Sequence, residues 1–263
     1  MTIISLTTDF GIRNGFVGVM KGVIYGVAPQ VKIVDISHII APQDIQEGAY
    51  ALWRAAPFFP HGTIHVYVVD PGVGTKRRPL AARLGGHYFV GPDNGLLTPL
   101  IEDAEKKDQP VEFVHLDNPR YWLPKVSRTF HGRDIFSPVA AHLANGIPLS
   151  ELGSPFTDPV RMKLTRPEKT ERGWVAHITV IDTFGNLTTD LPADALQGRT
   201  DVLLRLRGVE VNGIAESYGY KEPGDLVALV DSEDYIEIAV VNGNAAQELG
   251  AQIGDVVEVI CEG

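Results

Sequence analysis

The sequence predicts an α/β N-terminal domain with a largely parallel sheet, followed by a smaller all-β, barrel-like C-terminal domain. In the first half, short runs rich in β-branched residues alternate with segments of helical periodicity, which indicates a sheet flanked by helices. In the second half, short strands and turn residues follow one another with little helix, which is typical of small barrels and sandwiches. A chain of 263 residues is long enough for one large domain and a smaller companion.

The first predicted elements alternate regularly between strand and helix. Asp44 is placed to cap the second helix, and Glu47, three residues later, would complete a capping box. Strands are predicted at 3–7, 31–36 and 63–70, and helices at 15–28 and 44–56.

A less regular stretch follows, and a further helix then closes the first domain. Apolar residues spaced along one face predict this helix over 132–146. Pro138 is tolerated in its first turn, and Gly146 is placed as its C-cap.

A segment rich in proline and charge, without a clean period, predicts a linker over 156–172. The domains are therefore expected at 1–155 and 173–263. In the second domain the predicted strands are 173–182, 201–208, 226–232, 235–241 and 255–260, with a short helix at 244–250.

Charge and composition exclude several classes of partner. The chain carries 33 acidic and 23 basic side chains, a net charge of -10, which repels nucleic-acid phosphates and anionic membrane surfaces. Its single cysteine, Cys261, has no partner for an internal disulfide, and the first residues lack the basic region of a signal peptide. We therefore expect a cytoplasmic protein that binds neither nucleic acid nor membrane.

Polar residues follow several predicted strands at the point where each strand ends. In open parallel sheets ligands bind beyond the carboxyl ends of the strands, so these residues would line one crevice. The alternative is that they cap helices and begin turns. The set consists of Asp9, Asp35, Asp70, Asp93 and Asn94.

His131 lies immediately before the closing helix. The positive end of a helix dipole lowers the pKa of a nearby histidine and keeps it neutral, which suits a proton acceptor. A lone histidine is more often structural, however, and Asp134 reads as an ordinary N-cap.

Two other kinds of site find no support. The Walker spacing and the GxGxxG fingerprint are absent from the sequence, which disfavours phosphate-loop chemistry. No HxH, HExxH or DxD spacing supports a dinuclear metal hydrolase, so we expect neither a metal nor a cofactor.

Six motifs, in order and at compatible spacings, give the chain a resemblance to one family over nearly its whole length. They are TTDFG (7–11), VVDPGVGTKRR (68–78), PDNGLLT (92–98), FHGRDIF (130–136), DTFGN (182–186) and NGNAA (242–246). The chain resembles the S-adenosyl-L-methionine hydroxide adenosyltransferases, relatives of the S-adenosylmethionine-dependent fluorinase and chlorinase. The resemblance implies hydrolysis of S-adenosylmethionine to adenosine and methionine, without a cofactor, by a homotrimer with sites between subunits.

The resemblance also implies a catalytic triad around the attacking water. Position by position, its members are Asp70, Arg77 and His131, whereas Arg78 would be a surface or structural charge. The halogenase branch does not keep the aspartate and the histidine. Water is therefore expected as the nucleophile, rather than a halide.

Further matched positions imply ligand-binding roles. Asp9 would hold the ribose hydroxyls, and Asp182 the ammonium of the methionine part. Adenine would be bound by Phe184 and Asn186 and by Asn244 and Ala245, and methionine by Ser232. Without the resemblance, each of these residues reads as an ordinary turn or cap residue.

Two positions depart from the halogenase pattern. Glu233 stands where the halogenases have an arginine for the methionine carboxylate, and Gln43 stands where they have a tryptophan.

Two other classes of function fit the residues less well: a module that binds S-adenosylmethionine or adenosine without turnover, and a metal-dependent nucleoside or phosphate-ester hydrolase.

Overall fold

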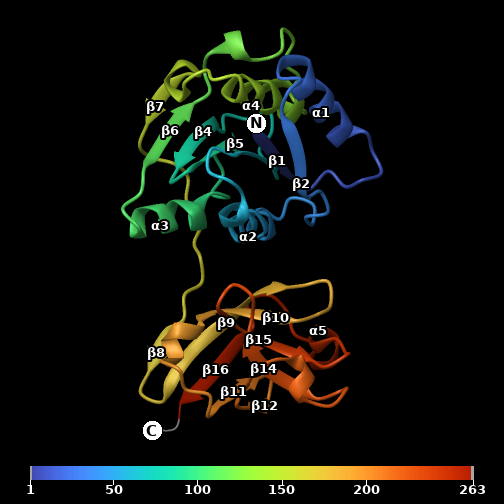
Figure 1. Ribbon diagram of the computed structural model, residues 1–263, viewed down its shortest axis with the longest axis vertical. Helices are drawn as coiled ribbons and strands as arrows, with labels where there is room; N and C mark the ends of the chain where they lie inside the picture. The colour runs from blue at the N-terminus through green and yellow to red at the C-terminus, as the bar shows by residue number, and fades with distance from the viewer. Residues whose placement is uncertain (1, 262–263) are drawn as a thin grey trace. The chain divides into compact units, whose positions relative to one another are not determined.

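The computed structural model describes residues 2–261, which form two compact units, Met1–Met162 and Lys163–Gly263 (Figure 1). The predicted linker range, 156–172, includes both the division between the units and a short strand, β8 (Glu168–Thr170), which pairs with β9 (Gly173–Ile181). None of the helices in the described range is long and apolar enough to cross a bilayer.

A mixed sheet organises the first unit. Its strands lie in the order β2-β1-β3-β5-β4-β6-β7. Neighbours from β2 to β5 run parallel, whereas the pairs β5-β4, β4-β6 and β6-β7 run antiparallel. The bounds are β1 Ile3–Thr8, β2 Lys32–Ser37, β3 Ile64–Val68, β4 Pro79–Leu84, β5 His87–Pro92, β6 Val111–His115 and β7 Ser154–Phe156.

The prediction of a largely parallel sheet is therefore wrong for the half that begins at β4. The signal that was missed is the pair Gly85 and Gly86, which joins β4 to β5 as a two-residue hairpin between Leu84 and His87. Gly85 has φ +56°, a left-handed conformation that favours glycine. The parallel half, in contrast, contains the strands predicted at 3–7, 31–36 and 63–70 and, in β5, the strand predicted before Asp93.

Helices cover both faces of this sheet (Figure 1). The helices α1 (Phe16–Val27) and α4 (Ser137–Ala144) pack on one face, where Met20, Ile24 and Val139 are fully buried. The helices α2 (Ile45–Ala55) and α3 (Thr98–Lys106) pack on the other. Sequence analysis missed α3. Short 3-10 helices lie at Ala56–Phe58, Pro119–Tyr121 and Leu149–Glu151.

The start of α2 confirms half of the predicted capping box. The Asp44 carboxylate accepts a hydrogen bond of 2.9 Å from the Glu47 backbone N–H, as an N-cap should. The Glu47 carboxylate does not return the bond to Asp44, because it accepts one of 2.8 Å from the Ala41 backbone N–H. Glu47 thus ties the preceding loop to the helix.

The predicted closing helix begins with a π-helical turn, Gly132–Phe136, and continues as α4. Pro138 lies in the first turn of α4, as predicted, and Asn145 rather than Gly146 is its C-cap. Asp134 is not an N-cap. It is fully buried inside the π-turn, where its carboxylate accepts hydrogen bonds from Ser127 and Arg133. Such turns are frequent at functional sites.

The second unit is a barrel-like sheet in the order β12-β11-β16-β9-β10-β15-β14-β13, which confirms the predicted class. One end of this order approaches the other through β12 and β14. The bounds are β10 Leu187–Pro192, β11 Val202–Leu206, β12 Val209–Asn212, β13 Ile214–Ala215, β14 Leu226–Val230, β15 Tyr235–Val240 and β16 Val256–Cys261, with α5 at Ala245–Leu249 and 3-10 helices at Ala193–Leu196 and Tyr218–Tyr220.

A buried histidine in the first unit predicts acid sensitivity. His65 on β3 is fully buried, its Nδ1 lies 2.6 Å from Ser5 Oγ, and its ring stacks on Phe89. Burial, and then the neighbouring His87, lower the pKa of His65 to about 3. The unfolded chain, with an ordinary histidine pKa near 6.5, therefore binds a proton that the folded chain excludes.

Because of His65, we expect the free energy of unfolding to fall by up to about 1.4 kcal/mol per pH unit as the pH drops from 6.5 towards 3. Above pH 6.5 the ring is neutral in both states, and this loss of stability is absent. Urea unfolding at several pH values measures this slope. His65→Asn keeps a group that can bond Ser5 and removes the titrating ring, so its slope should be shallower. Equal slopes in the two proteins would contradict the prediction.

Candidate active site

Asp70 and Arg77 form a buried ion pair just beyond the end of β3. Arg77 Nε lies 2.9 Å and 3.1 Å from the two carboxylate oxygens of Asp70, and Arg77 Nη2 also donates to Asp70 Oδ2. The Arg77 and Asp70 side chains are only 9% and 4% exposed. The loop between them is closed by hydrogen bonds from the Thr75 backbone and hydroxyl to the Gly72 carbonyl. This turn returns Arg77 to Asp70.

Glycine is required at one position of this loop. Gly74 has φ +75°, and a Cβ there would overlap the carbonyl oxygen of Arg128. The loop therefore packs directly against the segment that precedes the π-turn. This packing brings His131 towards Arg77.

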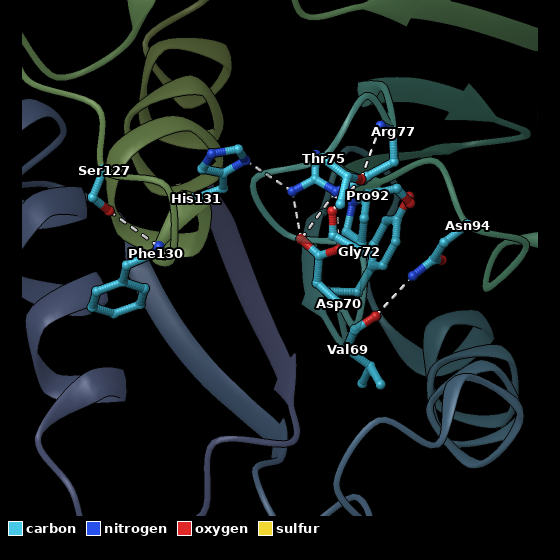
Figure 2. A network of polar contacts seen from close by, with 11 residues as sticks. Val69, Asp70, Gly72, Thr75, Arg77, Pro92, Asn94, Ser127, Phe130 and His131 are labelled. Carbon is cyan, nitrogen blue, oxygen red and sulfur yellow. Dashed lines mark hydrogen bonds and ion pairs between the residues drawn. The ribbon is translucent and has the colours of Figure 1, made fainter.

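His131, at the start of the π-turn, completes the group (Figure 2). Arg77 Nη2 lies 2.9 Å from His131 Nδ1. Because a guanidinium only donates hydrogen bonds, Nδ1 must accept, and the ring is then neutral with its proton on Nε2. Arg77 thus bridges a carboxylate and a neutral imidazole.

The environment of His131 favours this neutral form. Burial, and then the positive charge of Arg77, lower the pKa of His131 below its ordinary value of 6.5, against the opposing effects of Asp70 and Asp134. Protonation would replace the accepting lone pair by an N–H that faces the guanidinium. The site is therefore arranged to work with an uncharged imidazole.

We expect kcat/KM to be constant above the pKa of His131 and to fall as the pH drops through it, with a midpoint below 6.5. The pH profile of kcat/KM for the wild type and for His131→Gln measures this. The variant should lack this acid limb at its reduced rate. An unchanged limb in His131→Gln would assign the titration to another group.

A cavity of about 400 Å³ opens beside this group. Asp9, Asp70 and His131 line it, together with aromatic side chains. Arg77 Nη1 is buried and makes no hydrogen bond within the described part of the chain, so its two N–H groups can serve a water or a ligand. The site combines an anion, a cation and a neutral base next to a space large enough for a small molecule.

Asp9, directly after the end of β1, also lines the cavity. Its Oδ2 accepts a hydrogen bond of 2.9 Å from the backbone N–H of Gln43, which has φ +67°. A left-handed conformation is uncommon for a residue with a side chain, and here Asp9 helps to hold it. Gln43, which stands where the halogenases have a tryptophan, lines the cavity as well.

The other strand-end residues do not line this cavity. Asp93 accepts hydrogen bonds from Arg78 and the Val160 backbone, Asn94 bonds the Val69 carbonyl, and Asp35 pairs with Lys21. The prediction of one crevice lined by all five residues is therefore wrong for these three. Arg78 also binds Asp158, which confirms that it is a structural charge.

Three aromatic residues of the cavity were missed by the sequence analysis. Phe10, Phe16 and Phe130 meet edge to face, with ring centroids 5.3–5.9 Å apart. Phe10 and Phe130 each adjoin a predicted site residue, and that adjacency was the available signal. They give the cavity an apolar part of its lining beside Asp70 and His131.

In the second unit, the two motifs assigned to adenine lie together. The Asp182 carboxylate accepts hydrogen bonds from the backbone of Phe184 and from the backbone and side chain of Asn186. The Asn244 side chain caps α5 through the Gln247 backbone N–H, and a Cβ at Gly185 would overlap it. Phe184 is 74% exposed, whereas Ala245 is buried. One surface therefore presents both turns.

The turn after β14 carries Ser232, which was assigned to methionine, and Glu233, which stands where the halogenases have an arginine. Ser232 is exposed, and the Asp231 carboxylate accepts a hydrogen bond of 2.9 Å from the Glu233 backbone N–H.

Among residues 2–261, no three or more histidine, cysteine, aspartate or glutamate side chains are arranged to hold a metal ion.

Comparison with known proteins decides the family. The model of the SAM hydroxide adenosyltransferase N-terminal domain matches residues 4–153, and that of the C-terminal domain matches residues 176–258. The chain belongs to the SAM hydroxide adenosyltransferase family. The predicted family is thus confirmed, and both units have a counterpart in it.

Individual relatives of the family agree with this. A Salinispora tropica protein named (R)-S-adenosyl-L-methionine hydrolase is 39% identical, over 97% of both chains. A fluorinase from an Actinoplanes species is 29% identical, over 90% of each chain. A crystal structure of an uncharacterized conserved protein from Thermotoga maritima has a TM-score of 0.90 and 36% identity, and covers 97% of this chain and 99% of that one. The similarity is greater to the named hydrolase than to the fluorinase.

Proposed function

We propose that this protein hydrolyses S-adenosyl-L-methionine to adenosine and L-methionine, with water attacking C5' of the ribose. The observation that carries the proposal is the pair Asp70 and His131 at the wall of the cavity, with Arg77 bonded to both. The names of the full-length relatives support the same activity. No cofactor is required, because the sulfonium already makes methionine a good leaving group.

The residues divide the chemistry among them. Water oxygen forms a bond to C5', the C5'–S bond breaks, and its electron pair goes to sulfur, so one proton must leave the water. Asp70 is the acceptor that the geometry offers, because its two oxygens keep lone pairs beyond the bonds from Arg77, whereas the single accepting nitrogen of His131, Nδ1, is already bonded to Arg77. Arg77 Nη1 donates to the water and favours hydroxide character. Positioning of the water opposite sulfur supplies the larger part of the rate.

Water, rather than a halide, is the nucleophile in this proposal. The negative charge of the Asp70 carboxylate repels a halide anion from the position of the nucleophile, whereas a neutral water can bind there. The halogenase branch lacks the aspartate and the histidine that this chain keeps, and the fluorinase is the more distant relative.

Oxygen-18 water tests the reaction directly. The protein is incubated with the (R) and (S) sulfonium epimers of S-adenosylmethionine, with and without chloride and a chelator, and products are read by mass spectrometry. Labelled adenosine with methionine in every condition supports water attack without a metal. Intact substrate with both epimers would instead make the protein a binding module, and loss of activity with chelator would overturn the metal-free reaction.

We further propose a cytoplasmic homotrimer in which the turns of the second unit bind the nucleoside. Sedimentation tests the trimer.

Replacing Asn186 by Ala should weaken adenosine binding by about 1–3 kcal/mol, because a polar edge of adenine is left without its partner. Calorimetry measures the affinity, and Asn212→Ala on the exposed part of β12 is the control. Unaltered affinity would remove Asn186 from the site.

A further inference from the structure

A chain of polar contacts leads from the surface of the first unit to the strand end that carries Asp9. Lys21 Nζ donates a hydrogen bond of 2.6 Å to Asp35 Oδ2, and His38 Nε2 lies 3.1 Å from Asp35 Oδ1. On its other side, His38 Nδ1 lies 2.8 Å from Thr8 Oγ1. Asp35 is 40% exposed, His38 is 7% exposed and Thr8 is fully buried. None of these four residues lines the cavity.

The chemistry of the groups sets the direction of these contacts. Although burial raises the pKa of Asp35, the hydrogen bond from Lys21 and the His38 ring 3.1 Å away hold it below its usual value, so Asp35 is a carboxylate and only accepts. In the neutral imidazole, Nε2 then carries the proton and Nδ1 accepts the Thr8 hydroxyl. The Thr8 oxygen, in turn, accepts the Phe10 backbone N–H at 3.3 Å.

His38 therefore fixes the backbone on both sides of Asp9. Through Thr8 it sets the turn that ends at Phe10, and its own carbonyl accepts a hydrogen bond of 2.7 Å from the Gly11 backbone N–H. Asp9 lies in the middle of this short segment, where one carboxylate oxygen is already bound to the Gln43 N–H. The direction of the other oxygen depends on the backbone that His38 holds.

We propose that His38 is a positioning residue that aims the Asp9 carboxylate at the hydroxyl groups of a bound ribose. It acts through Thr8 and the 8–11 backbone and does not touch the ligand. The inference rests on the proposed function, because it takes the ligand to be a ribonucleoside held by Asp9. A carboxylate that binds two vicinal hydroxyls is sensitive to small errors of orientation, which a buried supporting residue prevents.

The test compares adenosine with 2',3'-dideoxyadenosine, which lacks both hydroxyls. The variants are His38→Leu and Thr8→Val, with His38→Asn and Thr8→Ser as the conservative partners. The matched control is His65→Leu, which breaks a buried contact of the same kind between a histidine and the Ser5 hydroxyl of the same strand. Calorimetry gives the dissociation constants, and steady-state kinetics with S-adenosylmethionine gives KM and kcat.

We expect His38→Leu and Thr8→Val to raise the dissociation constant of adenosine and KM by about 10- to 100-fold and to leave kcat within about threefold. Dideoxyadenosine binding should change by less than about threefold, and His38→Asn and Thr8→Ser should recover most of the adenosine affinity. His65→Leu should lower stability without changing the preference for adenosine.

The outcomes separate the two proposals. If the wild type binds adenosine and dideoxyadenosine equally well, the assignment of Asp9 to the ribose fails. If the wild type prefers adenosine over dideoxyadenosine, and both His38→Leu and His38→Asn show the same preference as the wild type, His38 has no positioning role. Equal losses for both nucleosides in His38→Leu would likewise overturn the proposal, because they indicate a general structural effect.

Discussion

Replacing Asp70 by Asn, or His131 by Gln, is expected to slow the turnover of S-adenosylmethionine by about two to four powers of ten, the usual worth of a positioned acid or base. Adenosine binding should change little, because neither side chain is assigned to the nucleoside. Both residues contact the same guanidinium, so their effects should not add in the double variant.

Single-turnover rates and calorimetric affinities measure these two quantities separately. Asp158→Asn is the matched control, since this carboxylate also binds an arginine but its side chain is 80% exposed and outside the cavity. It should keep the wild-type rate. Unchanged rates in both Asp70→Asn and His131→Gln would remove the pair from the reaction.

Replacing Arg77 by Met should cost about 3–5 kcal/mol of unfolding free energy, the usual penalty for removing one partner of a buried ion pair. The reason is that the Asp70 side chain, 4% exposed, would keep its charge in the interior without a cation. Urea denaturation measures the loss. Turnover should fall with it, because the water loses its cationic donor.

The double variant Asp70→Asn with Arg77→Met should recover part of this stability, because no isolated charge remains. Arg83→Met is the control in the same unit, where Arg83 and Glu112 form a pair whose side chains are 44% and 54% exposed. It should change stability by less than about 1 kcal/mol. An Arg77→Met protein as stable as Arg83→Met would contradict the burial argument.

Local patterns predicted the parallel half of the first sheet and the class of the second unit, because alternation and strand spacing are visible within short windows. They failed at β4, where a hairpin turned the chain against the expected direction through Gly85 and Gly86. The glycine pair is a hairpin signal, but the segment that becomes β4 was not predicted as a strand, so the pair had a predicted strand on one side only. The sheet was therefore misjudged because one strand of a local hairpin was missed.

The candidate active site was likewise predicted in part and missed in part. Asp9, Asp70 and His131 were found by their places next to strand and helix ends, and they do meet at one cavity. Asp134 and His38 were missed as supports, because their partners, Ser127 and Thr8, are known only once the chain is folded. Short motifs predict which side chains touch a cavity better than which residues hold them there.

The division into two units has a consequence for how such a protein can change. All three side chains proposed for the chemistry precede Met162, and the turns proposed for adenine and methionine follow it. Substitutions that alter which sulfonium compound is accepted can therefore accumulate in one unit without disturbing the groups that order the water. Exchange of whole C-terminal domains between family members offers evolution, and protein engineering, a route to new substrates with the hydrolytic machinery intact.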